Sequence, residues 1–120
     1  MAEFQESNFN NIIRQIIKKS LFTERQIEII LNQKDLLESK FSITKGAYYR
    51  QVGQSREKLV ALFYSIILLH GLDILLPDDI DVISKLSEYV RVMNVGDVFP
   101  EREEQITSVI DMTIRKACNM

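Results

Sequence analysis

Cysteine and histidine each occur only once in this chain of 120 residues, and tryptophan is absent. The single cysteine, Cys118, cannot form an intramolecular disulfide, which favours a reducing, intracellular setting. His70 has only Asp73 beside it as a second candidate ligand, and structural metal sites usually need four. We therefore interpret His70 as a core or boundary residue and Cys118 as an incidental thiol, and we expect no metal ion and no cofactor.

Familiar catalytic and ion-binding motifs are also missing. The acidic group Asp78, Asp79 and Asp81 is not followed by the glycine and terminal glutamate of a calcium-binding EF-hand loop. The chain contains no phosphate-binding glycine loop, no Gly-x-Ser-x-Gly and no His-Glu-x-x-His. We therefore predict that the chain is not an enzyme.

Long uninterrupted apolar runs are absent as well. The longest apolar stretch, Leu59 to Leu76, is broken by His70, Gly71 and Asp73, whereas a membrane-spanning helix needs about 20 apolar residues. The first residues, MAEFQESNFNN, lack the basic stretch and apolar core of a signal peptide. We expect a protein with no membrane association and a cytoplasmic location.

Prolines and glycines are few, at two and four, while 46% of the residues are hydrophobic. That composition suits one helical domain over residues 1–120. No two-residue alternation of apolar and polar residues marks a strand, so we predict an all-α fold of about five helices. The predicted helices run from Asn8 or Asn10 to near Ser20, from Thr23, from Thr44 to Gly71, from Pro77 to Asn94 or Gly96, and from Pro100.

The second predicted helix has a well-marked start. Thr23 and Gln26 have the spacing of a capping box, in which each side chain satisfies an exposed backbone N–H group of the other. Phe22 and Ile27 have the spacing of the accompanying hydrophobic staple. Beyond this start, an apolar face is predicted from Ile27, Ile30, Leu31 and Leu37.

The third predicted helix changes character along its length. Its apolar residues form a narrow stripe at first and an almost continuous apolar surface later, so we expect a partly exposed first half and a buried second half. The second half has more apolar residues than one small core needs, and we expect dimerisation there. The candidate dimerisation residues are Leu62, Ile66 and Leu69.

Opposite the apolar stripe, the first half of this helix is polar and basic. Arginine and glutamine form bidentate hydrogen bonds with base edges in a major groove, and basic residues contact phosphates. Gly46 and Gly53 each cost the helix about 1 kcal/mol relative to alanine, but they allow close backbone approach. The candidate DNA-binding residues are Lys45, Tyr49, Arg50, Gln54 and Arg56.

Two segments, FTERQIEII (22–30) and ITKGAYYRQVGQSREKL (43–59), resemble the two ends of a LuxR-type or sigma-factor region 4 helix-turn-helix. In those families a capped helix of the form LTERQ-E- precedes a recognition helix of the form IS-GTVK-HL--IREKL. The resemblance implies that Lys45, Tyr49, Arg50 and Gln54 face DNA, while Tyr48 and Val52 pack inward. The pair of segments also resembles the shortened helix-turn-helix units of small archaeal regulators.

The sequence departs from that pattern at two places. The intervening NQKDLLESKFS is several residues shorter than the middle helix of those families, and Ser55 occupies a position where they have an apolar residue. Either the middle helix is abridged or the similarity is coincidental. On this interpretation a helix-turn-helix-like unit covers about residues 22–60, and a helical body that also dimerises covers about 59–118.

Charge is unevenly distributed along the chain, although the net charge is only -2. Residues 1–70 contain ten Lys and Arg against seven Asp and Glu, and residues 71–120 contain five against ten. The sequence thus favours a homodimeric transcriptional regulator that binds double-stranded DNA. The alternative is a non-enzymatic all-α adaptor that binds another protein through Tyr48, Tyr49 and the apolar stripe.

Overall fold

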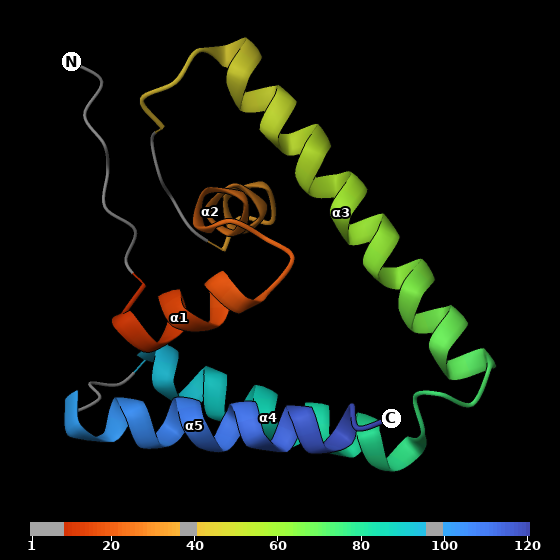
Figure 1. The fold of residues 1–120 in the computed structure, drawn as a ribbon. Coiled ribbons are helices and arrows are strands. Elements are labelled where there is room, and N and C mark those ends of the chain that lie inside the picture. The colour runs from red at the N-terminus through yellow and green to blue at the C-terminus, as the bar shows by residue number, and fades with distance from the viewer. Residues whose placement is uncertain (1–8, 37–40, 96–99) are drawn as a thin grey trace. The chain divides into compact units, whose positions relative to one another are not determined.

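The computed structural model describes residues 9–36, 41–95 and 100–120. Within these residues the secondary structure is helical, with no strand, so the predicted all-α fold of about five helices is confirmed. Figure 1 shows the helices in chain order. They are α1 (Asn11–Lys19), α2 (Glu24–Gln33), α3 (Lys45–Gly71), α4 (Pro77–Val95) and α5 (Pro100–Ala117).

Side-chain caps define the starts of α1 and α2. The Oδ1 atom of Asn10 accepts a hydrogen bond of 2.9 Å from the Ile13 backbone N–H, so Asn10 is the residue that caps α1. At α2 the predicted capping box is present. The Gln26 N–H donates to Thr23 Oγ1 over 3.1 Å, and the Thr23 N–H donates to Gln26 Oε1 over 3.0 Å.

The later helices also begin where the sequence places them. The Thr44 hydroxyl accepts a bond of 3.1 Å from the Ala47 N–H at the start of α3, which ends at Gly71 as predicted. At α4, Asp79 accepts from the Leu76 N–H over 2.8 Å. Acidic residues lie in the first turns of α4 and α5, where they complement the positive end of the helix dipole.

The chain divides into two compact units. The described residues of the first unit fall within Ile17–Ile67, and those of the second fall within Phe9–Ile16 and Leu68–Met120. Both α1 and α3 therefore contribute residues to each unit.

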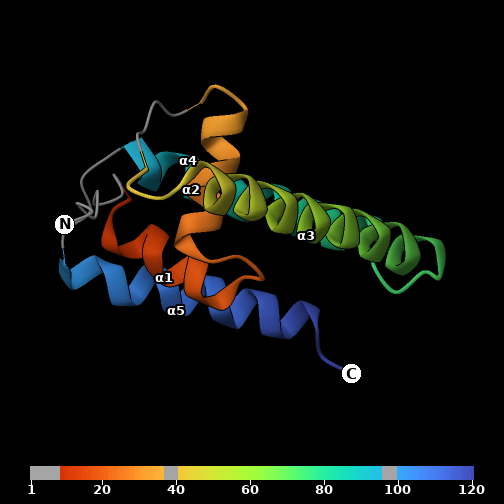
Figure 2. The ribbon, with the colours of Figure 1, turned by 90° about the horizontal axis from the view of Figure 1, so that it is seen from above.

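The core of the first unit lies where α2 crosses the first half of α3, as Figures 1 and 2 show. Ile29 of α2 is fully buried there, and Val52 of α3 is nearly so. Ile29 was not among the apolar positions predicted for α2, whose Ile27, Ile30 and Leu31 are only partly buried. The predicted position Leu37 lies outside the described residues.

In the second unit, α4 and α5 run side by side (Figure 1) and pack with α1. Its buried cluster consists of Ile12, Met93 and Ile110, with Ile16, Leu86, Val90 and Ile106 packed around it. Not every apolar residue of α4 and α5 is buried. Ile83 and Tyr89 of α4 are about half exposed, and so are Val109 and Ile114 of α5.

The prediction that the second half of α3 is buried is wrong. Phe63, Tyr64 and Ile67 are 64%, 70% and 66% exposed. A ten-residue helix such as α2 is only about 15 Å long, whereas the 27 residues of α3 extend over about 40 Å. Because α2 crosses α3 at its first half, the apolar surface farther along α3 has no described neighbour within its unit.

Candidate nucleic-acid interface

Lys58 anchors α3 to the start of α2. Its ammonium group donates to Gln26 Oε1 and to the Leu21 carbonyl oxygen, each over 2.8 Å. The same Gln26 oxygen belongs to the capping box, and Gln26 is only 5% exposed. The ammonium also lies 6.0 Å from the centre of the Phe22 ring. One lysine therefore ties the cap of α2 to the middle of α3.

Tyr48 provides the corresponding anchor at the other end of α2. Its hydroxyl donates to Asn32 Oδ1 over 2.7 Å and accepts from Gln33 Nε2 over 2.8 Å. The Tyr48 ring also contacts Phe41, with the ring centres 5.4 Å apart. This inward position of Tyr48 agrees with what the helix-turn-helix resemblance implied.

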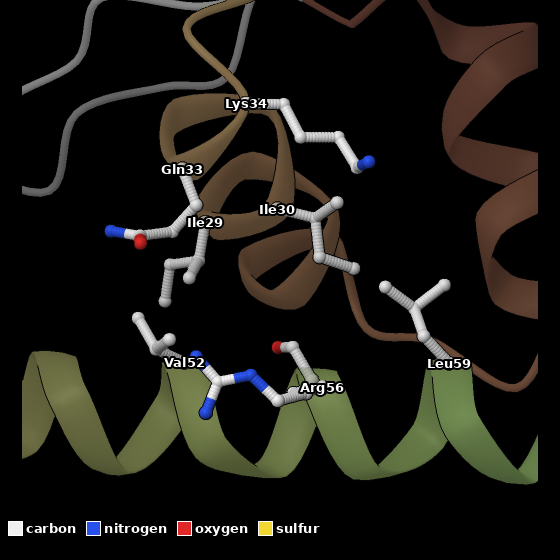
Figure 3. Close-up of a pocket in the computed structure, with 8 residues that line it drawn as sticks. Ile29, Ile30, Gln33, Lys34, Val52, Arg56 and Leu59 are labelled. Atoms are coloured by element: carbon white, nitrogen blue, oxygen red, sulfur yellow. The ribbon is translucent and has the colours of Figure 1, made fainter.

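Between these two anchors the contact is mainly apolar. Figure 3 shows Ile29 and Val52 pointing toward one another from α2 and α3. A cavity of about 120 Å³ lies at this contact and is also lined by Ser55 and Arg56. Ser55 is 1% exposed, and its hydroxyl has no hydrogen-bond partner among the described residues. The small serine replaces the expected apolar residue at the inner side of α3.

All five predicted DNA-binding side chains are exposed on α3. At about 100° of rotation per residue, Val52 and Ser55 lie on the inner side of the helix toward α2. Lys45, Tyr49 and Arg56 border that side, roughly 20–60° around the helix from Val52, whereas Arg50 and Gln54 lie roughly 160° from it. The five residues thus form two rows separated by the glycines Gly46 and Gly53. We call these the basic row (Lys45, Tyr49, Arg56) and the second row (Arg50, Gln54), and together with the glycines they make up the outer face.

The two arginines of the outer face make no ion pair with any residue of the described ranges. Elsewhere arginines do pair with acids: Arg115 Nε lies 2.8 Å from Asp111 Oδ2, and Arg91 contacts Glu88. The outer face therefore carries two arginines that no ion pair among the described residues holds in place.

Among the described residues, no intramolecular contact accounts for the two glycines of the outer face. A Cβ atom added at Gly46 or Gly53 would meet nothing within 4 Å. Packing among the described residues would thus accept alanine at either position, and alanine would stabilise the helix. Because glycine has no side chain, the two glycines leave the helix backbone accessible between the two rows.

The three predicted dimerisation residues lie on the other side of α3. Leu62 and Leu69 are half-buried, and Ile66 is 42% exposed. Their helical positions place them on the same side of α3 that α2 covers in the first half of the helix. The more exposed apolar residues of this half, Phe63, Tyr64 and Ile67, continue the outer face instead.

Sequence reasoning missed Lys58 and the hydroxyl of Tyr48 as the residues that position α3. The spacing of apolar residues gives no signal for a lysine that reaches a buried glutamine 32 positions away. The capping box did identify Gln26, and the interruption of the apolar stripe did identify Ser55.

Among the described residues, no three His, Cys, Asp or Glu side chains group as metal ligands. None of the described helices combines the length and the apolar character needed to cross a membrane. No family model, curated protein or solved structure matches this chain.

Proposed function

We propose that this protein binds double-stranded DNA through the outer face of α3 and acts as a homodimeric, non-enzymatic transcriptional regulator. The first half of α3 is the recognition helix, and α2 is the helix that supports it. The helix-turn-helix resemblance of residues 22–30 and 43–59 is part of this proposal.

The observation that carries the proposal is the composition and exposure of the outer face. Three cations, a tyrosine and a glutamine project from one rigidly anchored helix, and Arg50 and Arg56 have no acidic partner among the described residues. Arginine and glutamine suit base edges, while lysine and the start of the helix suit phosphates. Two glycines that packing among the described residues does not require would let the phosphate backbone approach closely.

The charge distribution is compatible with this use. Residues 45–58 contain four cations (Lys45, Arg50, Arg56 and Lys58) and one acid (Glu57), which gives a local charge of +3. Lys58 is engaged with α2, so the outer face keeps three cations. A duplex therefore has an electropositive surface to bind even though the whole chain is slightly acidic.

Fluorescence anisotropy of a labelled generic duplex at low and at moderate salt tests the proposal. We expect binding that weakens as salt rises, because phosphate contacts release counterions. Arg50→Ala/Arg56→Ala should reduce the salt-dependence slope by about 2 if both arginines contact phosphates. A specific base contact does not register on a generic duplex, so the loss measured here is that of the phosphate contacts.

The matched control is Arg91→Ala/Arg115→Ala, which removes the same charge from two exposed arginines that pair within α4 and α5. It should leave the affinity within about twofold of that of the natural sequence. Absence of binding at low salt, or equal losses for the two double variants, would refute DNA binding by the outer face.

A protein-binding adaptor is the second candidate function, and a groove in the second unit favours it. The groove has a volume of about 580 Å³ and lies between α4 and α5. Its lining is apolar apart from Gln105 and the tyrosine hydroxyl, and consists of Tyr89, Val92, Met93, Gln105, Ile106, Val109 and Ile110. Retention of a protein partner that is lost with Val109→Asp, without any DNA binding, would favour this function.

A further inference from the structure

The second half of α3 presents an apolar surface with the geometry of a helix-docking site. Val60, Phe63, Tyr64 and Ile67 have the spacing i, i+3, i+4 and i+7, which is the arrangement that receives one side chain from a facing helix. They are 42%, 64%, 70% and 66% exposed. The same four residues, with Arg56 and Leu59, line a groove of about 310 Å³.

We propose that these four residues, the α3 hole, form a two-fold antiparallel contact with α3 of a second copy of this chain. A second copy fits because the contact is self-complementary: the aromatic rings that border the hole of one copy can enter the hole of the other. No Asp, Glu, Lys or Arg occurs between Val60 and Gly71, so the pairing brings no like charges together.

The exposed area of the hole would supply about two-thirds of what the smallest stable interfaces bury. A buried aromatic side chain covers about 150–250 Å², so Phe63 and Tyr64, each roughly two-thirds exposed, present about 250 Å². With Val60 and Ile67 the hole presents roughly 400 Å² per copy, as much as the largest apolar patch of a typical monomer. Two copies would bury about 800 Å², against about 1,200 Å² for the smallest stable interfaces, and the flanking turns of α3 would add to this.

This contact differs from the one that the sequence predicted. Leu62, Ile66 and Leu69 lie on the inner side of α3, roughly 110–170° around the helix from the centre of the hole. The hole instead lies on the same side as the basic row, and Arg56 borders both surfaces.

Two-fold pairing at the hole also fixes the direction of the second row. The two-fold axis of an antiparallel pair is perpendicular to the plane that contains both helices, and so lies about 90° around each helix from the contact. Arg50 and Gln54 lie roughly 90–130° around the helix from the centre of the hole. Both side chains therefore point nearly along this axis. Such an axis leaves that direction unchanged, so the second rows of both copies face the same side of the dimer.

The distance between the second row of one copy and that of the other follows from the length of helix that separates each row from the two-fold axis. The centre of the hole lies between Phe63 and Tyr64, about 17 Å along α3 from the midpoint of Arg50 and Gln54 at a rise of 1.5 Å per residue. In an antiparallel pair the two midpoints are thus roughly 35 Å apart, close to one turn of duplex DNA. This spacing rests on the proposed function, whereas the dimer contact does not.

The first test is the mass of the protein in solution without DNA, measured by light scattering over a range of concentrations. We expect twice the 14.0 kDa of one chain, and a loss of dimer for Phe63→Asp/Ile67→Asp. The control is Ser65→Asp, an exposed residue on the opposite side of α3, which should remain dimeric. Circular dichroism checks that each variant keeps its helix content.

A monomer at all concentrations would overturn the proposal, and folding of another part of the same chain over the hole would then be the remaining explanation. A dimer that survives Phe63→Asp/Ile67→Asp would overturn the assignment of the face. A monomer would also remove the homodimeric part of the proposed function, whereas DNA binding by the outer face is tested separately by the titration of Arg50→Ala/Arg56→Ala.

Cysteine cross-linking tests the antiparallel direction. In a Cys118→Ser background, a mixture of Val60→Cys and Ile67→Cys chains should form a cross-link between the two kinds of chain, because residue 60 of one copy then lies opposite residue 67 of the other. Each variant alone should cross-link at least tenfold less. Efficient linking of Val60→Cys with itself would indicate a parallel pair and overturn the proposed geometry.

Discussion

The two halves of α3 belong to one continuous helix, yet they present opposite surfaces. The first half is polar and basic outside, and α2 holds its inner side through Lys58, Tyr48 and the contact of Ile29 with Val52. The second half is apolar, and Phe63, Tyr64 and Ile67 are exposed. The half with the fewer apolar residues is thus the one that its own unit packs, which shows that hydrophobic content alone does not determine burial.

The two halves of α3 are therefore suited to different kinds of contact. The first half is fixed in position and exposes side chains suited to hydrogen bonds, as a surface for recognition requires. The second half exposes surface that water solvates poorly, which is characteristic of surfaces that bind protein. One helix would then connect a DNA contact to a contact between copies, and its stiffness would set the distance between the two recognition faces.

Ile29→Ala should give the largest effect, because it removes the residue at the centre of the α2–α3 contact. Truncation of a fully buried isoleucine costs about 2–5 kcal/mol of unfolding free energy, measured by urea denaturation. Leu36→Ala is the control, since Leu36 is 69% exposed and its loss should change stability by about 0.5 kcal/mol or less. Similar losses for the two variants would mean that α2 does not pack on α3 as described.

Tyr48→Phe should have an intermediate effect. The change removes one hydroxyl and with it the bonds to Asn32 and Gln33 at the end of α2, which should cost about 1–2 kcal/mol in the same denaturation experiment. Tyr64→Phe makes the same chemical change at a side chain that is 70% exposed, and should be nearly neutral. Equal effects at the two positions would contradict the anchoring role of Tyr48.

Gly53→Ala should give the smallest change in stability and the sharpest test of the outer face. The added methyl group enters open space, so α3 should gain about 0.5–1 kcal/mol. Affinity for the duplex should nevertheless fall, because the methyl group lies between the two rows that we propose to contact DNA. Gly71→Ala also meets open space but lies at the end of α3, and should leave DNA affinity unchanged. A stabilised Gly53→Ala protein with full DNA affinity would show that the glycine does not serve a close contact.

The starts and ends of the helices were predictable from the sequence because capping is local. Thr23 with Gln26, Thr44 with Ala47, and Asp79 with Leu76 interact over three residues, so their spacing in the chain is enough to predict their hydrogen bonds. The candidate outer face was predictable for the same reason. Helical periodicity places Lys45, Tyr49 and Arg56 in one row whatever lies beyond the helix.

Burial and anchoring were decided by the tertiary structure. The full burial of Ile29 and the exposure of Phe63 depend on where a short helix crosses a long one, which neither residue's neighbours specify. The bond from Lys58 to Gln26 joins residues 32 positions apart, and periodicity carries no information about such a pair. The sequence by itself therefore determined which segments are helical and which side chains share a face. Only the packing of those helices decided which faces meet and which stay exposed, because burial depends on the reach of neighbouring elements.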